Sequence, residues 1–399
     1  MSNHADDADS LQQQANAPNA PNAPGAPRSP APTTEDARWM QRALRLARQG
    51  EGAVEPNPMV GCVIVRDGQV IGEGYHERWG GLHAERQALA NCPEDVALEG
   101  ATWYVTLEPC CHTGKTPPCT DAVLAARPRR VVVAMRDPFP KVDGGGLQRL
   151  RQAGVEVHLG VCQKEAETLN APYLKRVREG RPWVIAKWAM TLDGRIATAT
   201  GHSQWISCEA SRAAVHRLRG RCDAVIVGGG TAEADNPTLT ARPPGPRTPA
   251  RIVVSPRGRL SLDSNLVKTL DQGPVRLFTS AAETVVAPLR EAGVDVVALE
   301  GDTPGDHLHM VLDHCGAAGM TNVLVEGGGK LLGTLFDVDA IDEYHVFIAP
   351  KVVGGKDAIS PLGGLGRIHV YDSPEFEPCQ IRQIDQDVYI IARRRPAAE

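Results

Sequence analysis

The segments Gly80-Gly-Leu-His83-Ala-Glu85 and Leu107-Glu-Pro-Cys110, followed by Cys119, decide how the first half of this chain folds. One histidine and two cysteines make a three-ligand zinc set that leaves the fourth position open for water, as catalytic zinc requires. Glu85 need not bind the metal, so its carboxylate is free to shuttle protons. We therefore predict a catalytic zinc ion held by His83, Cys110 and Cys119, with Glu85 as the acid–base group.

The spacing of these residues constrains the local structure. Residues two apart in a regular helix do not share a face, so His83 and Glu85 converge only if His83 lies at the very start of a helix. We expect that helix over Ala84–Ala90, with Gly80 and Gly81 permitting the sharp entry. Thr102–Leu107 is predicted to be a buried strand, and Pro109 then turns the chain so that Cys110 is expected at a second helix start.

His-x-Glu followed by Pro-Cys is typical of zinc deaminases, which favours hydrolytic removal of an amine from a base. A structural zinc site and reduced core cysteines are the alternatives, and His83 or Cys119 taken singly fits these more often. Cys111 and His112 are expected outside the ligand set, because a fourth protein ligand would close the site.

Composition excludes several classes of protein. The chain has 399 residues, enough for two ordinary domains. Its 43 Lys and Arg are balanced by 48 Asp and Glu, so no basic excess indicates a nucleic-acid partner. Ten cysteines without a signal peptide or a long apolar span favour a reducing, cytoplasmic location and no membrane association.

Three regions succeed one another along the chain. Residues 1–35 are rich in Ala, Pro and Asn and are expected to be disordered and dispensable. Residues 36–180 are predicted to form the zinc-dependent deaminase domain, ending in one helix over Glu165–Arg181. Residues 181–399 form a second domain, in which apolar strands such as Ala224–Val227 and Asn322–Val325 alternate with helices. This alternation predicts α/β sheets covered on both faces.

Two glycine-rich turns come directly after apolar strands of the second domain, Gly228-Gly-Gly-Thr231 and Gly327-Gly-Gly-Lys-Leu-Leu-Gly333. Backbone amides at such a helix start suit phosphate. Neither turn fits G-x-G-x-x-G, because Leu332 occupies the third glycine position, so a standard dinucleotide fingerprint is absent. Taken alone, these turns fit tight strand–helix connections better than a phosphate site.

A series of motifs runs in a fixed order from about residue 36 to the end. The first half contains Pro56-Asn-Pro-x-Val-Gly-Cys-Val63, His83-Ala-Glu85 and Thr106-Leu-Glu-Pro-Cys110 with Gly114-x-Thr-Pro-Pro-Cys119. The second half contains Lys187-x-Ala-x-Thr-Leu-Asp-Gly194, Gly201-x-Ser-Gln-Trp-Ile206, Ala234-Asp-Asn-Pro-x-Leu-Thr240, Val325-Glu-Gly-Gly328 and Ile348-Ala-Pro-Lys351. In this order they resemble the bifunctional riboflavin-biosynthesis deaminase/reductase family.

The resemblance implies a cytidine-deaminase-like three-layer α/β/α domain followed by a dihydrofolate-reductase-like α/β domain. The first would deaminate a phosphorylated pyrimidine, 2,5-diamino-6-(5-phosphoribosylamino)pyrimidin-4(3H)-one, with Zn²⁺. The second would reduce the ribosyl side chain of the product to ribityl with NADPH. A homo-oligomer, a dimer or higher, is also expected.

The resemblance also assigns roles to individual residues. Lys187 would be a catalytic cation of the reductase, although a buried ion-pair partner is the alternative. Substrate-side positions are Asn57, Ser203, Arg219, Leu239, Arg242 and Glu326. Cofactor-side positions are Ala189, Trp205, Thr231, Asp235, Gly328, Gly329 and Gly333. Of the two arginines, Arg242 is expected to anchor the substrate phosphate, because a guanidinium engages two phosphate oxygens at once.

The sequence departs from the family pattern at a few positions, and two alternative functions stay open. Cys111 and Thr191 both stand where relatives carry Ser. Eight residues separate Cys110 from Cys119, unlike the Pro-Cys-x-x-Cys of cytidine deaminases. One rival is a nucleoside or tRNA-adenosine type deaminase fused to an inactive reductase-like domain. The other is a zinc-stabilised RNA-binding module, which the balanced charge and the lack of basic runs with interleaved aromatics disfavour.

Overall fold

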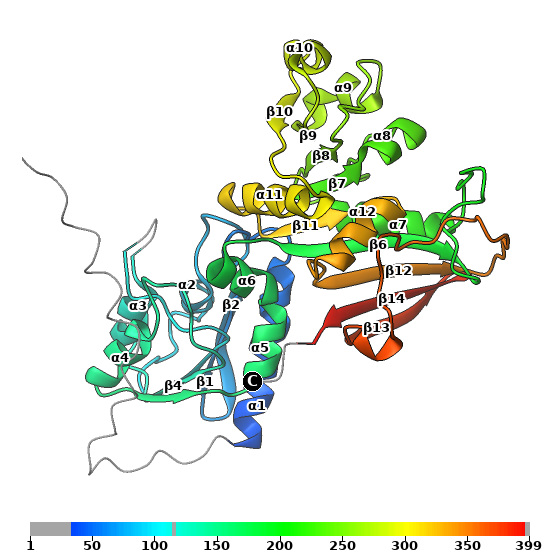
Figure 1. Cartoon of the computed structure of the whole chain (residues 1–399). Helices are drawn as coiled ribbons and strands as arrows, with labels where there is room; N and C mark the ends of the chain where they lie inside the picture. The colour runs from blue at the N-terminus through cyan, green and yellow to red at the C-terminus, as the bar shows by residue number, and fades with distance from the viewer. Residues whose placement is uncertain (1–32, 114–116, 396–399) are drawn as a thin grey trace, which may run out of the picture.

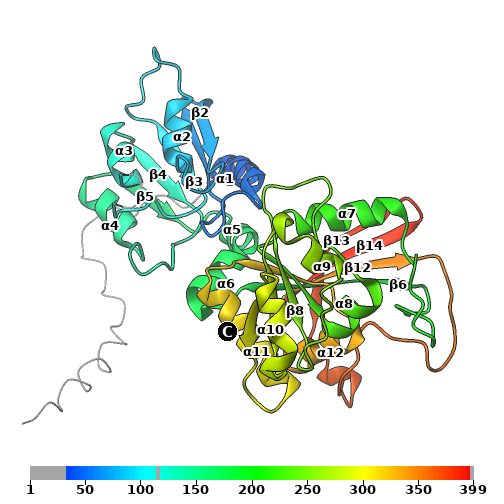
Figure 2. The same cartoon turned by 90° about the horizontal axis from the view of Figure 1, so that it is seen from above.

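The computed structural model describes residues 33–113 and 117–395 and arranges them as two lobes, each built on its own β-sheet (Figures 1 and 2). The predicted tail lies almost wholly outside the described residues, which begin at Thr33. Helix α1, Thr34–Ala47, opens the first lobe. None of the helices in the described ranges has the length and hydropathy needed to span a bilayer.

The first lobe has a five-stranded sheet in the order β2-β1-β3-β4-β5. Strand β1 pairs antiparallel with β2 and β3, whereas β3, β4 and β5 are parallel. The strands are β1 Gly61–Arg66, β2 Gln69–Tyr75, β3 Thr102–Val105, β4 Arg130–Val133 and β5 Glu156–Leu159. The helices after α1 are α2 Ala84–Ala90, α3 Cys119–Ala125, α4 Gly145–Gln152, α5 Gln163–Leu169 and α6 Ala171–Glu179, and a 3-10 turn, η1, covers Arg48–Gly50.

Side-chain alternation along the strands builds one core on each face of this sheet. Val63 and Val65 pack with α1, α5 and α6, whereas Cys62 and Ile64 pack with α2, α3 and α4. Successive residues of a strand point to opposite faces, so a strand apolar on both faces needs helices on both. The predicted three-layer α/β/α domain is therefore confirmed.

The start of α1 is closed by a reciprocal cap. The Thr33 hydroxyl accepts from the Asp36 N–H, and the Asp36 carboxylate accepts from the Thr33 N–H. Asp36 also accepts from Tyr104 at 2.9 Å and from Arg130 at 2.7 Å. Burial alone would raise the pKa of Asp36, but these hydrogen bonds outweigh it and lower the pKa to about 2. One carboxylate thus ties α1 to β3 and β4.

The second lobe has a nine-stranded sheet in the order β10-β9-β8-β7-β11-β6-β12-β14-β13. Neighbouring strands from β10 to β12 are parallel, and β14 and β13 pair antiparallel. The strands are β6 Trp183–Thr191, β7 Ala224–Gly228, β8 Ala250–Val254, β9 Val275–Thr279, β10 Asp295–Ala298, β11 Asn322–Val325, β12 Glu343–Ala349, β13 Phe376–Ile384 and β14 Asp387–Arg394.

Helices cover both faces of this larger sheet. The α-helices are α7 Glu209–Arg219, α8 Gly229–Asp235, α9 Asn265–Lys268, α10 Glu283–Glu291, α11 Pro304–Ala317 and α12 Gly329–Asp337, with 3-10 turns η2 Leu270–Gln272 and η3 Val370–Asp372. Leu308 of α11 and Leu332 of α12 pack on one face, and Leu218 of α7 and Leu289 of α10 on the other. The predicted two-domain α/β class, with a dihydrofolate-reductase-like second half, is confirmed.

Two local predictions were wrong, and one strand was not predicted. Cys110 lies in a loop, and the second helix begins at Cys119. The helix expected over Glu165–Arg181 breaks at Asn170, whose side chain accepts from the Met59 N–H and donates to the Met59 carbonyl. Strand β13 was not anticipated, because most of its side chains are exposed and its sequence lacks apolar alternation.

Candidate active sites

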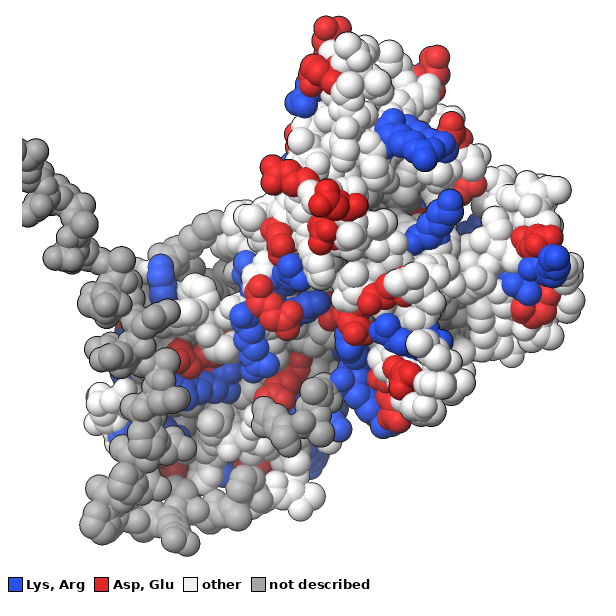
Figure 3. Space-filling view, in the orientation of Figure 1, with Lys and Arg blue, Asp and Glu red and all other residues white. Residues whose placement is uncertain are grey.

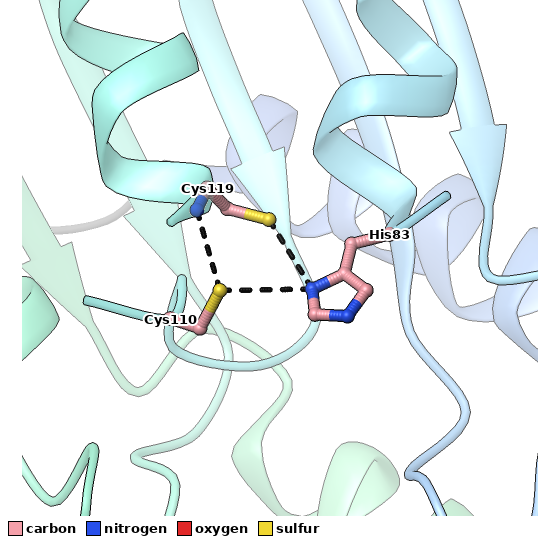
Figure 4. Close-up of side chains that lie close together, drawn as sticks. All are labelled: His83, Cys110 and Cys119. Carbon is pink, nitrogen blue, oxygen red and sulfur yellow. Dashed lines mark hydrogen bonds between the residues drawn. The ribbon is translucent and has the colours of Figure 1, made fainter. Parts of the chain in front are cut away.

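The predicted zinc ligands converge although they lie up to 36 residues apart in the chain. Their side chains point toward one another from the start of α2, from the start of α3 and from the loop between β3 and α3 (Figure 4). His83 Nδ1 lies 3.6 Å from Cys110 Sγ and 3.3 Å from Cys119 Sγ. All three ligand atoms lie within 4.8 Å of one another, which fits a shared metal ion.

His83 lies at the start of a helix, as its separation of two residues from Glu85 requires. His83 is the N-cap residue of α2, with extended backbone at φ −72° and ψ 159°. Gly80 adopts φ +78°, a conformation that favours glycine. Glu85 then lies in the first turn with 3% of its surface exposed. Burial raises the pKa of the Glu85 carboxyl, as suits a group that must both accept and release protons.

The thiols are electronically unequal. A hydrogen bond from the Cys119 thiol, opposed by burial and aided by His83, lowers the pKa of Cys110. The Cys119 backbone N–H also donates to Cys110 Sγ at 3.2 Å. The thiolate is the form of cysteine that binds metal. Cys111 lies aside, with its Sγ 3.8 Å from the Lys141 carbonyl oxygen.

A pocket of about 320 Å³ opens over these residues and is lined also by Asn57, His76, His112 and Asp137. His76 Nδ1 lies 2.8 Å from the Leu82 carbonyl oxygen, so this nitrogen carries the proton. Its Nε2 therefore accepts from Asn57 Nδ2 at 3.1 Å. Burial lowers the pKa of His76, which keeps the ring neutral and the amide of Asn57 oriented. Sequence reasoning missed His76, because a lone histidine after a strand carries no distinguishing pattern.

Glu108 was also missed and fixes the loop beside the ligands. Its buried carboxylate accepts four backbone N–H groups, from Asp137, Gly144, Gly146 and Leu147 at 2.9–3.3 Å. A Cβ on Gly146 would come within 2.1 Å of the Pro109 carbonyl oxygen, so the loop fits only around glycine. A glutamate directly after a buried strand and two residues before a ligand was the available signal.

In the second lobe, Glu326 lies at the end of β11 and gathers two cations. Its carboxylate binds Arg219 through Nε at 2.6 Å and Nη2 at 3.0 Å, and Lys187 Nζ at 3.4 Å. Burial alone would raise the pKa of Glu326, but these charges outweigh it and lower the pKa to about 2. The structure therefore brings Lys187, Arg219 and Glu326 together. The Arg219 guanidinium is already paired with the Glu326 carboxylate.

The two glycine turns meet at the same edge of the sheet, because β7 and β11 are parallel neighbours. The Thr231 hydroxyl accepts from the Gly328 N–H at 3.1 Å and joins them. A Cβ on Gly230 would meet nothing within 4 Å, and one on Gly328 would meet only Thr231 at 3.4 Å. These two positions leave room for a cofactor's phosphates to approach the backbone.

Two other predicted cofactor glycines are packed against protein. A Cβ on Gly329 would lie 2.5 Å from the Ser360 carbonyl oxygen, and one on Gly333 would lie 2.0 Å from the Gly363 carbonyl oxygen. The Gly363 N–H also donates to the Gly329 carbonyl at 2.8 Å. In this structure, Gly329 and Gly333 allow loop 360–364 to lie on α12.

The remaining predicted positions differ in exposure. The Trp205 ring is 63% exposed and lies under the Arg212 guanidinium at 4.6 Å. Leu239 is buried at φ +56°. Arg242 is exposed and has no hydrogen-bond or ion-pair partner within the described part of the chain. Ser203 and Ala189 are partly buried, and Asp235 is exposed.

Charge on the visible face of the molecule is mixed. Lys and Arg alternate with Asp and Glu over both lobes and at their junction, without a continuous basic stripe (Figure 3). A nucleic-acid surface would gather cations along one face.

Two family models match the chain. The model described as the cytidine and deoxycytidylate deaminase zinc-binding region matches residues 33–135. The model described as the RibD C-terminal domain matches residues 182–390. The first match contains His83 and Cys110, and the second contains the Lys187–Arg219–Glu326 cluster.

Similar proteins extend over both lobes. Riboflavin biosynthesis protein RibD of Actinobacillus pleuropneumoniae is 42% identical over 357 residues, 89% of this chain and 91% of that protein. The protein of the same name from Escherichia coli (strain K12) is 39% identical over 376 residues, 89% of this chain and 98% of that protein.

Similar solved structures also cover both lobes. Acinetobacter baumannii RibD, form 1, is similar with a TM-score of 0.79 and 35% identity, over 91% of this chain and 99% of that chain. A diaminohydroxyphosphoribosylaminopyrimidine deaminase/5-amino-6-(5-phosphoribosylamino)uracil reductase from Thermotoga maritima is similar with a TM-score of 0.78 and 35% identity, over 90% and 99%.

Proposed function

The chain belongs to the RibD family of bifunctional riboflavin-biosynthesis enzymes, and from this premise we propose how its own residues divide the two reactions. It is a zinc-dependent deaminase and an NADPH-dependent reductase in one chain. The deaminase acts on 2,5-diamino-6-(5-phosphoribosylamino)pyrimidin-4(3H)-one, and the reductase converts the ribosyl side chain of the product to ribityl. We assign deamination to residues 36–180 and reduction to residues 181–399.

In the deaminase, His83, Cys110 and Cys119 hold zinc, which when bound supplies the Lewis acidity that makes water nucleophilic near neutral pH. Glu85 takes a proton from the attacking water and delivers it to the departing amine. Asn57, oriented by His76, binds the amide edge of the pyrimidine. The observation that carries this proposal is the buried Glu85 carboxylate beside three ligand atoms that lie within 4.8 Å of one another.

In the reductase, NADPH when bound supplies the hydride. Thr231 and Gly328 are assigned to the cofactor side with Ala189, Trp205 and Asp235, and the open Gly230–Gly328 region supports this. Gly329 and Gly333 stay in the proposed set, although loop 360–364 packs against both. Reduction adds hydride to C1′ of the ribose and a proton to the ring oxygen as the C1′–O bond breaks. Lys187, held by Glu326, is proposed as the proton donor.

The substrate side of the reductase contains Ser203, Leu239, Arg242 and the Arg219–Glu326 pair. Arg219 is already engaged by Glu326, and Arg242 is exposed without an ion-pair partner in the described ranges. We therefore assign the 5′-phosphate to Arg242. A phosphate fixed at one end of the sugar sets the distance between C1′ and the nicotinamide.

We further propose a homo-oligomer in the cytoplasm. The exposed edge strand β13 and the segment before it display Leu365, Ile368, Val370, Tyr371 and Ile381, each at least 65% exposed. An exposed apolar edge of this kind favours association between copies. Sedimentation of the wild type and of Ile381→Lys tests it: the wild type should sediment as a dimer or larger, and the variant should dissociate.

The two activities are tested together by incubating the enzyme with the diaminopyrimidine phosphate, with and without NADPH. Amine release should occur in both samples, and nicotinamide absorbance should fall only when NADPH is present. Release of amine without any later oxidation of NADPH would instead support the fusion of a deaminase to an inactive reductase-like domain.

A further inference from the structure

A turn of the first lobe, residues 50–57, reaches from the deaminase pocket to the surface of the second lobe, and we call it the bridging turn. At its end is Asn57, beside His76 in the deaminase pocket. Glu51, Gly52 and Glu55 contact the second lobe, where Glu51 pairs with Arg221 at 2.7 Å. Hydrogen bonds from Ala53 and Val54 to the Gly50 carbonyl, and from Asn57 to the Val54 carbonyl, make the turn one rigid piece.

The matching surface of the second lobe is the loop of residues 240–247, which we call the substrate loop because it contains Arg242. The Thr240 carbonyl accepts from Arg219 Nη1 at 3.3 Å, and the Gly220 carbonyl accepts from the Arg247 N–H at 2.9 Å. A Cβ on Gly245 would come within 2.4 Å of the Gly220 carbonyl oxygen, so the loop lies directly on the end of α7. Movement of this loop would move both Arg242 and the surroundings of Arg219.

Arg247 joins the bridging turn to the substrate loop. Its guanidinium forms an ion pair with Asp223 of its own lobe, donates from Nη1 to the Glu55 carbonyl at 3.0 Å, and lies 4.0 Å from Glu55 Oε2. Asp223 is itself fixed, because its carboxylate accepts the N–H groups of Thr321 and Asn322 at 2.8 and 2.9 Å. The Arg247 guanidinium is therefore held on one side and presented to the first lobe on the other.

A cavity separates much of the bridging turn from the second lobe. Its volume is about 470 Å³, and it is lined by Glu51, Glu55 and Asn57 on one side and by Arg221 and Glu343 on the other. Because side chains do not pack across a cavity, polar contacts set the distance between the two surfaces here. The Glu51–Arg221 pair is partly exposed, and such pairs contribute little to stability. The acidic partners of Arg247, which are Glu55 and Asp223, are more buried than Glu51, the acidic partner of Arg221.

One further close contact sets the spacing. Gly52 adopts φ +82°, and a Cβ there would lie 2.7 Å from Arg221 Cβ and 3.1 Å from Pro246 of the substrate loop. Glycine thus lets the bridging turn approach the loop closely enough for Arg247 to reach the Glu55 carbonyl.

We propose that Arg247 is a positioning residue for both reactions, holding the bridging turn with Asn57 and the substrate loop with Arg242 in one fixed arrangement. Each lobe thereby sets the substrate affinity of the other. This inference rests on the proposed substrate roles of Asn57 and Arg242.

The test is a cross-lobe kinetic comparison on the full chain. Arg247→Lys keeps a charge for Asp223 but cannot span both partners, because an ammonium lacks the planar, two-sided donor set of a guanidinium. It should raise the KM for the diaminopyrimidine phosphate in deamination about fivefold, and the KM for the deaminated intermediate in reduction by a similar factor, with each kcat within about twofold. Gly52→Ala, a change in the deaminase lobe, should raise the KM of reduction.

A matched control is Lys175→Met. Lys175 of α6 pairs with Asp342 of the second lobe at 2.6 Å, an ion pair between lobes that touches neither the bridging turn nor the substrate loop. Its loss should lower the melting temperature and leave both KM values unchanged. Glu55→Gln, which preserves the backbone, replaces Gly52→Ala if the latter does not fold.

Three results overturn the proposal. Arg247→Lys could leave the deaminase KM unchanged, change only kcat, or act no differently from Lys175→Met. Asn57→Ala and Arg242→Lys are measured alongside. If these direct variants leave KM unchanged, the assigned substrate roles fail; if they raise KM while Arg247→Lys does not, only the bridging inference fails.

Discussion

The two active sites of this chain differ in how far the protein has completed them before any ligand binds. In the deaminase, three ligand atoms face one another and a buried carboxylate stands beside them, so the site needs only its metal ion. In the reductase, Arg219 and Lys187 share one carboxylate, that of Glu326, while Arg242 and Trp205 remain exposed. Metal catalysis demands fixed ligand geometry, whereas the reductase leaves part of its binding surface for substrate and cofactor to cover.

The largest expected effect tests the completed site. Glu85→Gln removes the proton shuttle and keeps the shape of the side chain, so deamination should fall by roughly two to four powers of ten. Zinc content should stay near one per chain, because Glu85 is outside the ligand set. Metal analysis and amine release measure this, and retained activity would refute the assignment.

The second effect is expected in the cluster of Arg219, Lys187 and Glu326. Glu326→Gln leaves a buried Arg219 without its carboxylate, which should lower the free energy of unfolding by about 3 kcal/mol at neutral pH and impair reduction. Because the folded-state pKa of Glu326 is lowered from 4.5 to about 2, its stabilisation is present above pH 4.5 and is lost as the pH falls toward 2.

Urea unfolding of the wild type and this variant at pH 7 and at pH 3 is the measurement. The difference in stability should be smaller at pH 3. An equal difference at both values would mean that the Glu326 charge is not what stabilises the cluster.

The third effect concerns the exposed part of the reductase. Arg242→Lys should raise the KM of reduction for the phosphorylated substrate about tenfold and leave that for NADPH nearly unchanged, because a lysine cannot engage two phosphate oxygens at once. Arg290→Lys, in an exposed arginine of α10, is the control and should change neither. An equal loss on a dephosphorylated substrate would show that Arg242 does not anchor the phosphate.

The smallest effect is expected at Cys111. Its thiol faces the Lys141 carbonyl and lies outside the ligand cluster, so Cys111→Ser should change neither zinc content nor the rate of deamination. Cys119→Ser should lose zinc under the same conditions. Loss of metal from the Cys111 variant would mean that the ligand set is wrong.

The deaminase site was largely predictable from the sequence, because its chemistry depends on local spacing. His83 at a helix start and Glu85 in the next turn are expected from two residues of separation and the preceding glycines. Cys110 was wrongly expected on a helix, because Pro109 indicates a turn but does not distinguish a loop from a helix after it. His76 and Glu108 act through partners far away in sequence, Asn57 and the loop near Gly144, which no local pattern shows.

The reductase site was less predictable, because its contacts join residues far apart in the sequence. The motif residues Lys187 and Glu326 were predicted to belong to the site, but the ion pairs that join Arg219 and Lys187 to Glu326 connect residues 107 and 139 positions apart. The packing of Gly329 and Gly333 against loop 360–364 was equally invisible, since glycine spacing alone does not tell a phosphate cradle from a close backbone approach. The alternation of apolar strands with helices indicated where the strands lie along the chain. It did not indicate which strands pair with one another in the sheet.

Two separate sites in this chain act one after the other, deamination before reduction. Glu85→Gln enzyme should be given NADPH together with either the diaminopyrimidine phosphate or the deaminated intermediate, and nicotinamide absorbance recorded. Oxidation of NADPH should be almost absent with the first substrate and should proceed at the wild-type rate with the second. Wild-type oxidation of NADPH with the diaminopyrimidine phosphate would contradict this order, because reduction would then not depend on the zinc site.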